Sequence, residues 1–590
     1  MSHTISDPPR RKARRLSLPV TPLWLTLPGV LYLFVFLVFP SIRLLSLSFV
    51  DHATGGLTLA MFGRFLGPSV YRQVLATTFA IAAETTVCAL LFGYPLTYWL
   101  SGQSKQRQRI TVLLVLLAYW TSSLVKNFAW LVLLGRNGFV AHTMAALGIA
   151  GGDHLLFNRA VVVFAMTHTM LPLAVVTMLP VMNQTDRRLS ISAATLGADA
   201  AQVFWRVFFP LSMRGVAAAG LLVFIGSLGF FITPTLLGSP KETMLGQLII
   251  TQINDLQNWQ FGSALAVVLV LSALLSCYIF DLLFGLSSFA EGNPSSTSAY
   301  KRKLRKFGME IAIAMGRLSS NLGKLMRHGI GTRLLSIYAW LLVCVLLFPI
   351  AAIIPMAFTA DSFLNFPPTS FSLQWFQTYF ESPLWIDATF RSFGIGVIVS
   401  LLALVFAALA ALGISRSSGR LSSALFLLFL LPMIVPSIVI AVALFYLFAH
   451  ISLVATNTGI IIGHTVIALP IVFVILLSTF KGHDWVLDRA ASTLGANRMQ
   501  TLRHITLPLL KEGIAAALVT AFLVSFEELT VALFIGAGIK TTLPKQLWDD
   551  ILLQVNPTLA AASVVVLSVV TLAFLLLQYL QPDRAKITMR

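Results

Sequence analysis

The chain has 590 residues, of which 57% are hydrophobic and only 11% are charged. Soluble proteins carry roughly a quarter charged residues, so this composition excludes an ordinary soluble enzyme. The net charge of +19 is better explained by cationic loops at a membrane face than by nucleic-acid binding.

Apolar runs long enough to cross ~30 Å of hydrocarbon recur along the chain. We predict an all-α polytopic membrane protein with twelve transmembrane helices, six in each half. The first six are expected at residues 22–49, 72–100, 110–134, 159–181, 214–235 and 261–287. The second six are expected at residues 333–358, 388–414, 420–449, 457–480, 511–533 and 558–581.

Lysine and arginine concentrate in alternate loops. If the N-terminus is cytosolic, 31 of the 41 basic residues fall in cytosolic segments. The positive-inside rule therefore predicts an inner-membrane protein with both termini in the cytosol. The first span follows "RRKARR" at Arg10–Arg15, and it is too long for a signal-peptide core, so we expect an uncleaved anchor.

The predicted domains follow from these spans. A basic N-terminus (1–21) precedes a first transmembrane domain (22–288), and a cytosolic linker (289–332) leads to a second one (333–582) and a tail (583–590). The linker carries either an interfacial helix near 307–326 or a solvated connector. Because each half has an even number of spans, the halves are parallel repeats about an axis along the membrane normal.

One polar segment occurs twice, 298 positions apart. It reads "AATLGADAAQVFWRVFFPLS" at Ala193–Ser212 and "ASTLGANRMQTLRHITLPLL" at Ala491–Leu510. An acidic start favours a helix N-terminus, and a following glycine favours its end. A proline suits the first turn of the next span. We predict helix, glycine turn, short helix and span, a unit that offers a docking surface.

These segments resemble the cytoplasmic loop of ABC importer permeases, in which Glu-Ala-Ala is followed by three residues, Gly, nine residues, Ile, one residue and Leu-Pro. The resemblance implies that each loop docks in a cleft of an ATPase subunit. Ile191 and Arg489 stand where the family has glutamate, and Asp488 is a candidate substitute in the second copy. The coupling residues implied are Ala193, Gly197, Ala198, Pro210, Asp488, Ala490, Ala491, Gly495, Ala496 and Pro508.

Further segments are similar to permeases of spermidine/putrescine importers. Val30–Phe49 and Tyr119–Gly135 resemble the first permease of such systems, and Ser525–Ile551 resembles the second. The resemblance implies a type I ABC importer fold made by fusion of two permeases. It implies an ATPase dimer that binds ATP and Mg, and a periplasmic solute-binding protein. Related branches carry 2-aminoethylphosphonate or ferric iron, so these substrates stay open.

Ionisable residues at membrane depth are candidates for the substrate path. Glu527 and Glu528 lie ~16 residues into a span, so roughly 24 Å from its cytosolic start. They would attract an organic cation, or one of them is solvated in a vestibule. Repeat symmetry sets Phe230 and Phe231 opposite them, either as a cation–π surface or as ordinary packing.

Other polar residues in spans are less specific. Glu84 is either a path residue or a protonated acid in helix packing. Lys126 is expected to extend outward to the membrane surface. Tyr119 and Trp120 resemble an aromatic pair of the family and are candidate cavity liners. No metal-ligand cluster is predicted.

The chain is not expected to be an enzyme. "GRLSSNLGKL", beginning at Gly316, has the wrong spacing for a phosphate-binding loop. We predict a transport subunit that works by alternating access, without cofactors of its own. An ion-coupled secondary transporter and a non-transporting membrane scaffold are the alternatives.

Overall fold

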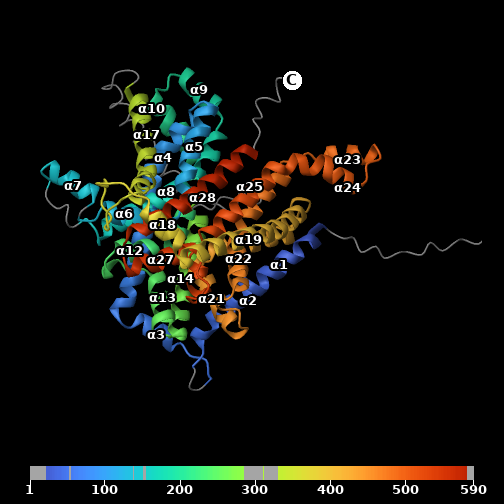
Figure 1. Cartoon of the computed structure of the whole chain (residues 1–590). Helices are drawn as coiled ribbons and strands as arrows, with labels where there is room; N and C mark the ends of the chain where they lie inside the picture. The colour runs from blue at the N-terminus through green and yellow to red at the C-terminus, as the bar shows by residue number, and fades with distance from the viewer. Residues whose placement is uncertain are drawn as a thin grey trace, which may run out of the picture.

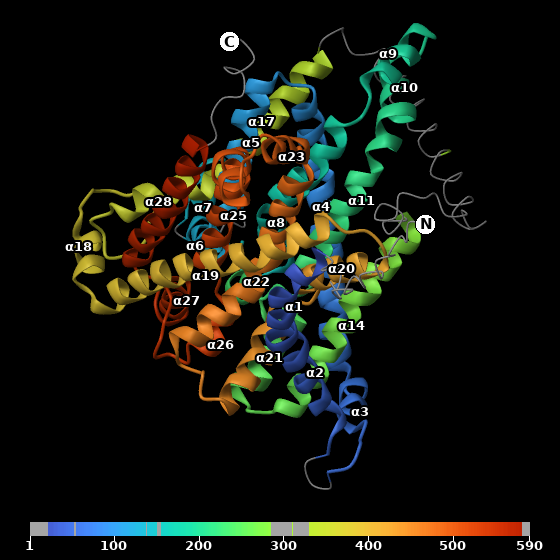
Figure 2. The same ribbon diagram turned by 90° about the vertical axis from the view of Figure 1, so that its right-hand side faces the viewer.

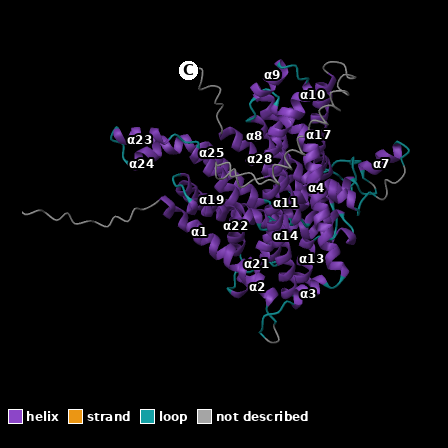
Figure 3. Cartoon of the chain, turned by 180° about the vertical axis from the view of Figure 1, so that it is seen from behind, coloured by secondary structure: helices purple, strands orange, loops and turns teal. Residues whose placement is uncertain are grey.

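The fold was analysed in a computed structural model that describes residues 22–51, 55–136, 138–149, 155–284, 310 and 330–580. In these ranges all regular structure is helical except for two isolated β-bridges, Val50–Leu57 and Thr359–Phe371 (Figure 3). Ten helices are long and apolar enough to span a membrane, or up to twelve if two bent pairs count as spans. The prediction of an all-α polytopic membrane protein is confirmed. The terminal segments 1–21 and 583–590 lie outside the described residues, as does nearly all of the predicted linker, including its candidate helix near 307–326.

The helices of the first half are α1 (Leu27–Leu33), α2 (Phe39–Ser46), α3 (Ala60–Leu66), α4 (Ser69–Ser101), α5 (Lys105–Trp120), α6 (Ser123–Leu133), α7 (Phe139–Ala146), α8 (Arg159–Asn183), α9 (Arg187–Thr195), α10 (Ala200–Val203), α11 (Phe209–Leu228), α12 (Ile232–Leu237), α13 (Leu245–Ile250) and α14 (Trp259–Phe284). Those of the second half are α17 (Ile330–Ala357), α18 (Gln374–Glu381), α19 (Pro383–Ser415), α20 (Arg420–Ile434), α21 (Ser437–His450), α22 (Asn457–Lys481), α23 (Trp485–Thr493), α24 (Arg498–Thr501), α25 (Leu507–Phe526), α26 (Thr530–Ile535), α27 (Leu543–Leu553) and α28 (Pro557–Leu580).

The two halves repeat one pattern of helices. From α8 onward each helix of the first half begins 298 positions before its counterpart, so that α8 matches α22, and α11 matches α25. For α3, α4 and α6 the offset is 314, as between α4 and α19, which are both 33 residues long. The difference is the extra chain between α6 and α8, which carries α7.

The third span of each half is sharply bent. The axes of α5 and α6 meet at 86°, and those of α20 and α21 at 95°. Pro436 lacks an N–H and directly precedes α21, while the Ser122 side chain accepts a hydrogen bond from Leu124 N and so caps α6. The spans predicted at 110–134 and 420–449 are therefore each built from two helices that meet at a sharp bend.

The fifth span of each half is also interrupted. It breaks at residues 229–231 between α11 and α12, and at residues 527–529 between α25 and α26. The helices predicted at 214–235 and 511–533 run across these breaks. Irregular backbone at membrane depth requires surrounding protein or a polar cavity, so the breaks mark the interior of the protein.

The first span of each half packs on the opposite half. Both views show α1 and α2 beside α19, α21 and α22 (Figures 1 and 2). The Tyr32 hydroxyl of the first span donates to Ile462 O in α22 at 2.8 Å. In the other direction, the Tyr338 hydroxyl of α17 donates to Phe92 O of α4 at 2.8 Å. The halves are thus joined by a reciprocal exchange.

A shared apolar cluster lies where the halves meet. It combines Phe128 of α6 and Phe231 beside α12 with Phe526 of α25 and Trp548 of α27. Exposed leucines cover the outer faces of the spans, where they would contact hydrocarbon: Leu91, Leu341 and Leu401 are 63%, 62% and 51% exposed. The interior breaks of the third and fifth spans are therefore held by a core that belongs to both halves.

Candidate functional site

The repeated polar segments form helix–glycine–helix units, which we call coupling segments 1 (Asp186–Phe208) and 2 (Asp484–Thr506). Asp186 caps α9 by accepting from Arg188 N, and Asp484 caps α23 by accepting from Val486 N. The turns after these helices contain Gly197 with φ +89° and Gly495 with φ +91°. The predicted helix, turn and helix are present in both copies. Their role in docking an ATPase stays a prediction.

The turn in each segment closes in the same way. Ala198 N donates to Ala193 O at 3.1 Å, and Ala496 N donates to Ala491 O at 3.0 Å. This is a six-residue closure in which the residue after the left-handed position bonds back into the last helical turn. Only the glycine must adopt a positive φ, a conformation disfavoured for residues with a Cβ.

The prolines predicted at the start of the fifth spans lie within longer helices. A π-helical turn precedes each: Phe204–Phe208 before Pro210, and Leu502–Thr506 before Pro508. Its wider hydrogen-bond spacing accommodates a residue without an N–H, so the helix continues from the coupling segment into the span. Each coupling segment is therefore joined to α11 or α25 by continuous helix.

The tips of the coupling segments are apolar and uncovered. Leu196 and Leu494 are each 88% exposed, and Ile191 is 63% exposed. Figure 1 shows α9–α10 and α23–α24 projecting from the helical body at two separate places. Arg489 is also exposed, so the two positions that depart from the family's glutamate both face outward, where a partner would meet them.

Asp488 braces coupling segment 2 from within. One carboxylate oxygen pairs with His483 Nε2 at 2.6 Å, and the other accepts from the Thr506 hydroxyl. Partial burial acts to raise the pKa of Asp488, but these hydrogen bonds and the His483 charge outweigh it and lower the pKa below its usual value. Both oxygens are thus engaged inside the chain. Ser190 occupies the equivalent position in segment 1, so that segment has no such carboxylate brace.

The breaks of the third and fifth spans meet across the two halves. A Cβ on Gly229, at the α11–α12 break, would lie 3.0 Å from Pro436 Cβ at the α20–α21 break. Glu527 stands at the position equivalent to Gly229 in the second half. The repeat therefore places Glu527 opposite the α5–α6 break of the first half. We call this second meeting point the Glu527 junction.

The Glu527 junction contains buried charges. Glu527 is partly buried, and its Oε1 is enclosed without a hydrogen-bond partner among the described residues. It interacts electrostatically with Lys126 of α6 and with Tyr119 near the end of α5. Lys126 is only 2% exposed, and its Nζ donates to Ala118 O at 3.0 Å. The expectation that Lys126 extends to the membrane surface is therefore wrong.

Glu528 has a different environment from its neighbour. Its carboxylate accepts from Thr530 N at 2.9 Å and from Val531 N at 2.8 Å, which caps the start of α26. The Nε2 of buried His464 lies 3.4 Å from Glu528 Oε2 without hydrogen-bond alignment, while Nδ1 contacts Ser525 Oγ at 2.9 Å. The Glu528 carboxylate is thus committed to local structure, whereas Glu527 keeps a free oxygen.

The aromatic candidates lie near the junction within apolar surroundings. Phe231 is 3% exposed and contacts Trp548 edge-on, with ring centres 5.6 Å apart. Phe230 packs against the same apolar cluster. Tyr119 and Trp120 form an edge-on pair at 5.1 Å where α5 ends. Tyr119 also interacts electrostatically with Glu527.

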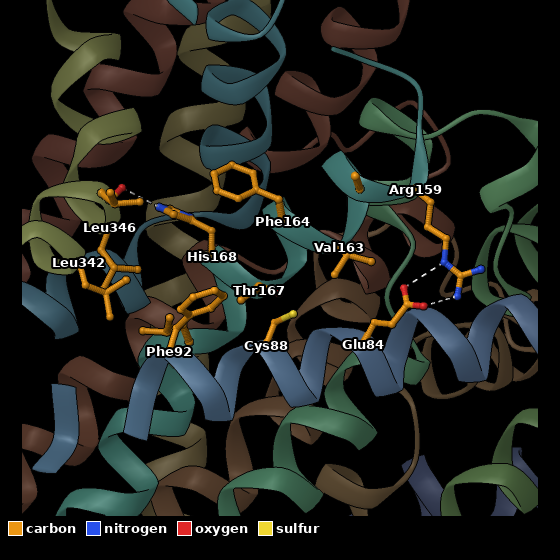
Figure 4. A pocket seen from close by; sticks show the side chains of 13 residues that line it. Glu84, Cys88, Phe92, Arg159, Val163, Phe164, Thr167, His168, Leu342 and Leu346 are labelled. Atoms are coloured by element: carbon orange, nitrogen blue, oxygen red, sulfur yellow. Dashed lines mark hydrogen bonds and ion pairs between the residues drawn. The ribbon is translucent and has the colours of Figure 1, made fainter. Parts of the chain in front are cut away.

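Glu84 lies elsewhere. It forms a two-pronged ion pair with Arg159, with Nε to Oε2 at 2.9 Å and Nη2 to Oε1 at 2.7 Å. This pair stands at one end of a cavity between α4, α8 and α17 (Figure 4). Glu84 is therefore not brought together with Glu527.

Sequence reasoning missed several of these contacts. Neither the Glu84–Arg159 pair nor the contact of His464 with Ser525 was among the predictions. Pro436 is only a partial signal: proline disfavours a helix interior, but Pro95 and Pro470 lie inside continuous helices of this chain. Nothing in local sequence indicates that Lys126 faces a break in the opposite half.

The two-half architecture, the interior breaks and the paired projecting segments are those of a multi-pass membrane protein built from two repeats. Residues 403–586 match the family described as binding-protein-dependent transport system inner membrane component. The chain is 30% identical over 251 residues to the spermidine/putrescine transport system permease protein PotB of Haemophilus influenzae, covering 41% of this chain and 87% of that protein. The chain belongs to the family of binding-protein-dependent ABC importer permeases of the spermidine/putrescine type, and it is a multi-pass inner-membrane protein.

Two further similarities were found. The Escherichia coli PotB permease is 28% identical over 252 residues, which are 42% of this chain and 90% of that protein. A solved bacterial alginate ABC transporter, in complex with an alginate pentasaccharide-bound periplasmic protein, has a TM-score of 0.38 and 15% identity, covering 44% of this chain and 91% of the other.

Proposed function

We propose that this chain is a fused permease that moves a small organic cation, a polyamine such as spermidine or putrescine, into the cytosol. Its PotB relatives are named as permeases of spermidine/putrescine transport systems. The observation that carries the proposal is the enclosed, unpartnered Oε1 of Glu527 at an interior break. A carboxylate in that position can replace water molecules in the hydration shell of an ammonium group.

The coupling segments suit a dimeric ATPase of the ATP-binding-cassette class. Two equivalent apolar tips, centred on Leu196 and Leu494, match two equivalent clefts in such a dimer. ATP and Mg would bind to that partner. The proposed orientation puts both segments and both chain termini in the cytosol. It follows from the concentration of lysine and arginine in alternate loops, because cytosolic loops of membrane proteins are enriched in these residues. A periplasmic solute-binding protein would then deliver substrate to the opposite face.

Alternating access follows from the way the segments join the spans. When the ATPase dimer closes, segments 1 and 2 approach each other, and the continuous helices carry that movement into α11 and α25. Glu527 lies at the far end of α25, directly at its break. Closure would thereby rearrange the Glu527 junction, where α25 meets the α5–α6 break. The substrate path would then open to the opposite side of the membrane.

Reconstituted transport tests this proposal. Proteoliposomes with the ATPase and binding protein should accumulate labelled spermidine or putrescine only with ATP, and Glu527→Gln should reduce uptake at least about tenfold. Glu528→Gln is the control at the neighbouring carboxylate. Glutamine keeps one of the two acceptors for the α26 backbone, so stability should fall, but uptake per inserted permease should be largely retained. Uptake without the ATPase, or with a proton gradient alone, would favour a secondary transporter and contradict the proposal.

A second candidate substrate is an aminoalkylphosphonate such as 2-aminoethylphosphonate. The observation that favours it is the buried ammonium of Lys126 beside Glu527, because a substrate with one positive and one negative group complements both. Lys126→Met distinguishes the two substrates. It should remove a counter-charge needed by a phosphonate, but it should remove only repulsion for a polyamine. A lack of phosphonate uptake by the wild-type permease would exclude this candidate, and phosphonate uptake that survives Lys126→Met would exclude the proposed role of Lys126.

A further inference from the structure

A cavity of about 780 Å³ lies between α4, α8 and α17. Its volume is in the range of cavities that bind small molecules. Figure 4 shows the Glu84–Arg159 pair at one end, Cys88 and Val163 along the middle, and Phe92 with His168 toward the other end. Apart from the polar ends, its lining is almost entirely apolar.

The cavity opens toward the hydrocarbon side of the helices. Phe92 and Phe164 line it and are 43% and 39% exposed, although they lie on membrane-spanning helices. Its walls come from both halves, since α4 and α8 belong to the first half and α17 to the second. His168 Nε2 approaches Val345 O at 3.3 Å and links α8 to α17 at the inner end.

The polar end lies at the level of lipid headgroups. Arg159 begins α8, whose other end leads into coupling segment 1. The 24 residue steps between Arg159 and Asn183 correspond to about 36 Å, which places Arg159 near the headgroup region opposite the coupling segments. The Glu84 and Arg159 side chains are 45% and 44% exposed, so both charges remain accessible.

The ion pair is electrically neutral but presents both signs. Arg159 uses Nε and Nη2 on Glu84, which leaves Nη1 to donate to an anion. Glu84 can accept further hydrogen bonds, because each carboxylate oxygen has two lone pairs. The complementary ligand therefore carries a phosphate and an N–H ammonium side by side, next to a long apolar body.

We propose that this cavity is a binding site for a phospholipid with a phosphoethanolamine headgroup. The phosphate binds Arg159, and the ammonium binds Glu84. One acyl chain follows α8 from Val163 toward Leu171, along a path whose length from Arg159 is about 18 Å.

The contacts with the headgroup make the proposed site selective for phosphoethanolamine. A choline headgroup has no N–H to donate to Glu84, and a glycerol headgroup leaves a net negative lipid facing a carboxylate. Because the bound chain would contact α8 and α17 together, the lipid fills a seam between the two halves. It would stabilise the arrangement in which α17 lies against the first half.

The native cysteines provide a probe. Cys88 lines the cavity, and Cys344 lies exposed on α17 outside it. Delipidated protein in detergent is treated with N-ethylmaleimide, and modification of each cysteine is followed by peptide mass spectrometry. Added phosphatidylethanolamine should slow labelling of Cys88 about tenfold, more than phosphatidylcholine or phosphatidylglycerol, while Cys344 should respond equally to all three lipids.

A paired variant tests the headgroup contacts. In Glu84→Gln with Arg159→Gln, which leaves no buried charge unpaired, the preference for phosphatidylethanolamine should disappear. Native mass spectrometry of the purified protein gives a second measure, in which the variant should lose one retained phosphatidylethanolamine. Equal protection by all three lipids, an unchanged preference in the variant, or protection of Cys88 by spermidine without lipid would overturn the proposal.

Discussion

Leu196 and Leu494 stand at the same point of the two coupling segments, 298 positions apart, and both are 88% exposed. Each side chain follows the last turn of a helix and directly precedes a glycine with positive φ. The turn holds the leucine outward in both copies. Full burial of such a side chain against a partner would contribute about 1.5–3 kcal/mol.

Replacing these leucines should weaken ATPase docking. Leu196→Asp or Leu494→Asp removes the apolar contact and sets a charge in its place, so ATPase affinity should fall by about tenfold to a hundredfold. Binding of purified ATPase to the permease in nanodiscs measures the effect. Leu57→Asp, at a leucine that is 91% exposed in the loop before α3, is the control and should bind normally. Equal losses in all three variants would contradict a specific role.

The glycine turns should be sensitive to backbone strain alone. A Cβ on Gly197 or Gly495 would meet no atom within 4 Å, yet both residues have positive φ. Alanine there should cost about 1–2 kcal/mol and lower the ratio of transported substrate to hydrolysed ATP. Gly482→Ala is the control, because Gly482 has φ −82°. Unchanged coupling in both turn variants would exclude a rigid turn as the requirement.

The hydrogen bonds of Asp488 predict a loss of local stability at acid pH. Hydrogen bonds and the His483 charge hold the pKa of Asp488 below its unfolded value, despite the opposing effect of burial. Its stabilising contribution is therefore complete above about pH 4 and is lost as the pH falls through the folded pKa. Asp488→Asn should lower the local stability of coupling segment 2 by roughly 1–2 kcal/mol. Hydrogen exchange in α23 at pH 7 should therefore be faster than in the wild type. The difference from wild type should shrink at low pH, and a constant difference down to pH 3 would contradict this account.

The buried charges at the Glu527 junction should be coupled. Lys126→Met leaves Glu527 without its cationic neighbour, and Glu527→Gln leaves Lys126 without its anionic one, so each variant should lower the melting temperature in detergent. The double variant should recover part of the loss, with a coupling free energy of about 1 kcal/mol or more. Strictly additive losses would mean that the two side chains do not stabilise each other.

The contact between Gly229 at the α11–α12 break and Pro436 at the α20–α21 break should tolerate no added volume. A Cβ on Gly229 would lie 3.0 Å from Pro436 Cβ, whereas one on Gly226 would lie 3.6 Å from the flexible Met170 side chain. Gly229→Ala should therefore destabilise the protein by about 1–3 kcal/mol, and Gly226→Ala should be nearly neutral. Equal melting temperatures for the two variants would argue against close contact between the breaks.

The coupling segments could be predicted because their signals are local and occur twice. Capping aspartates, a glycine at fixed spacing and a proline each favour one conformation, and the 298-residue repeat makes a chance match improbable. The bent spans could not be predicted in the same way. The chain is apolar on both sides of Ser122 and Pro436, so hydropathy does not distinguish one straight helix from two helices at nearly 90°.

Placement of the interior charges also required the structure. Distance along a helix suggested that Lys126 reaches the membrane surface, but which way it points depends on the helix from the other half that covers it. Likewise, Glu527 and Glu528 are adjacent and chemically identical in sequence. The backbone beyond them separates their environments, because α26 begins where the Glu528 carboxylate can cap it.

The bond between Tyr32 and Ile462 spans 430 positions of the chain. At about 5–20 residues per second of synthesis, the first span would enter the membrane some 20–90 s before its partner helix exists. In water an unpartnered apolar helix would aggregate during that interval, but hydrocarbon solvates it. Because the first spans are exchanged between the halves, lipid must solvate the N-terminal span during biosynthesis. This span can complete its packing only after the second half of the chain has been made.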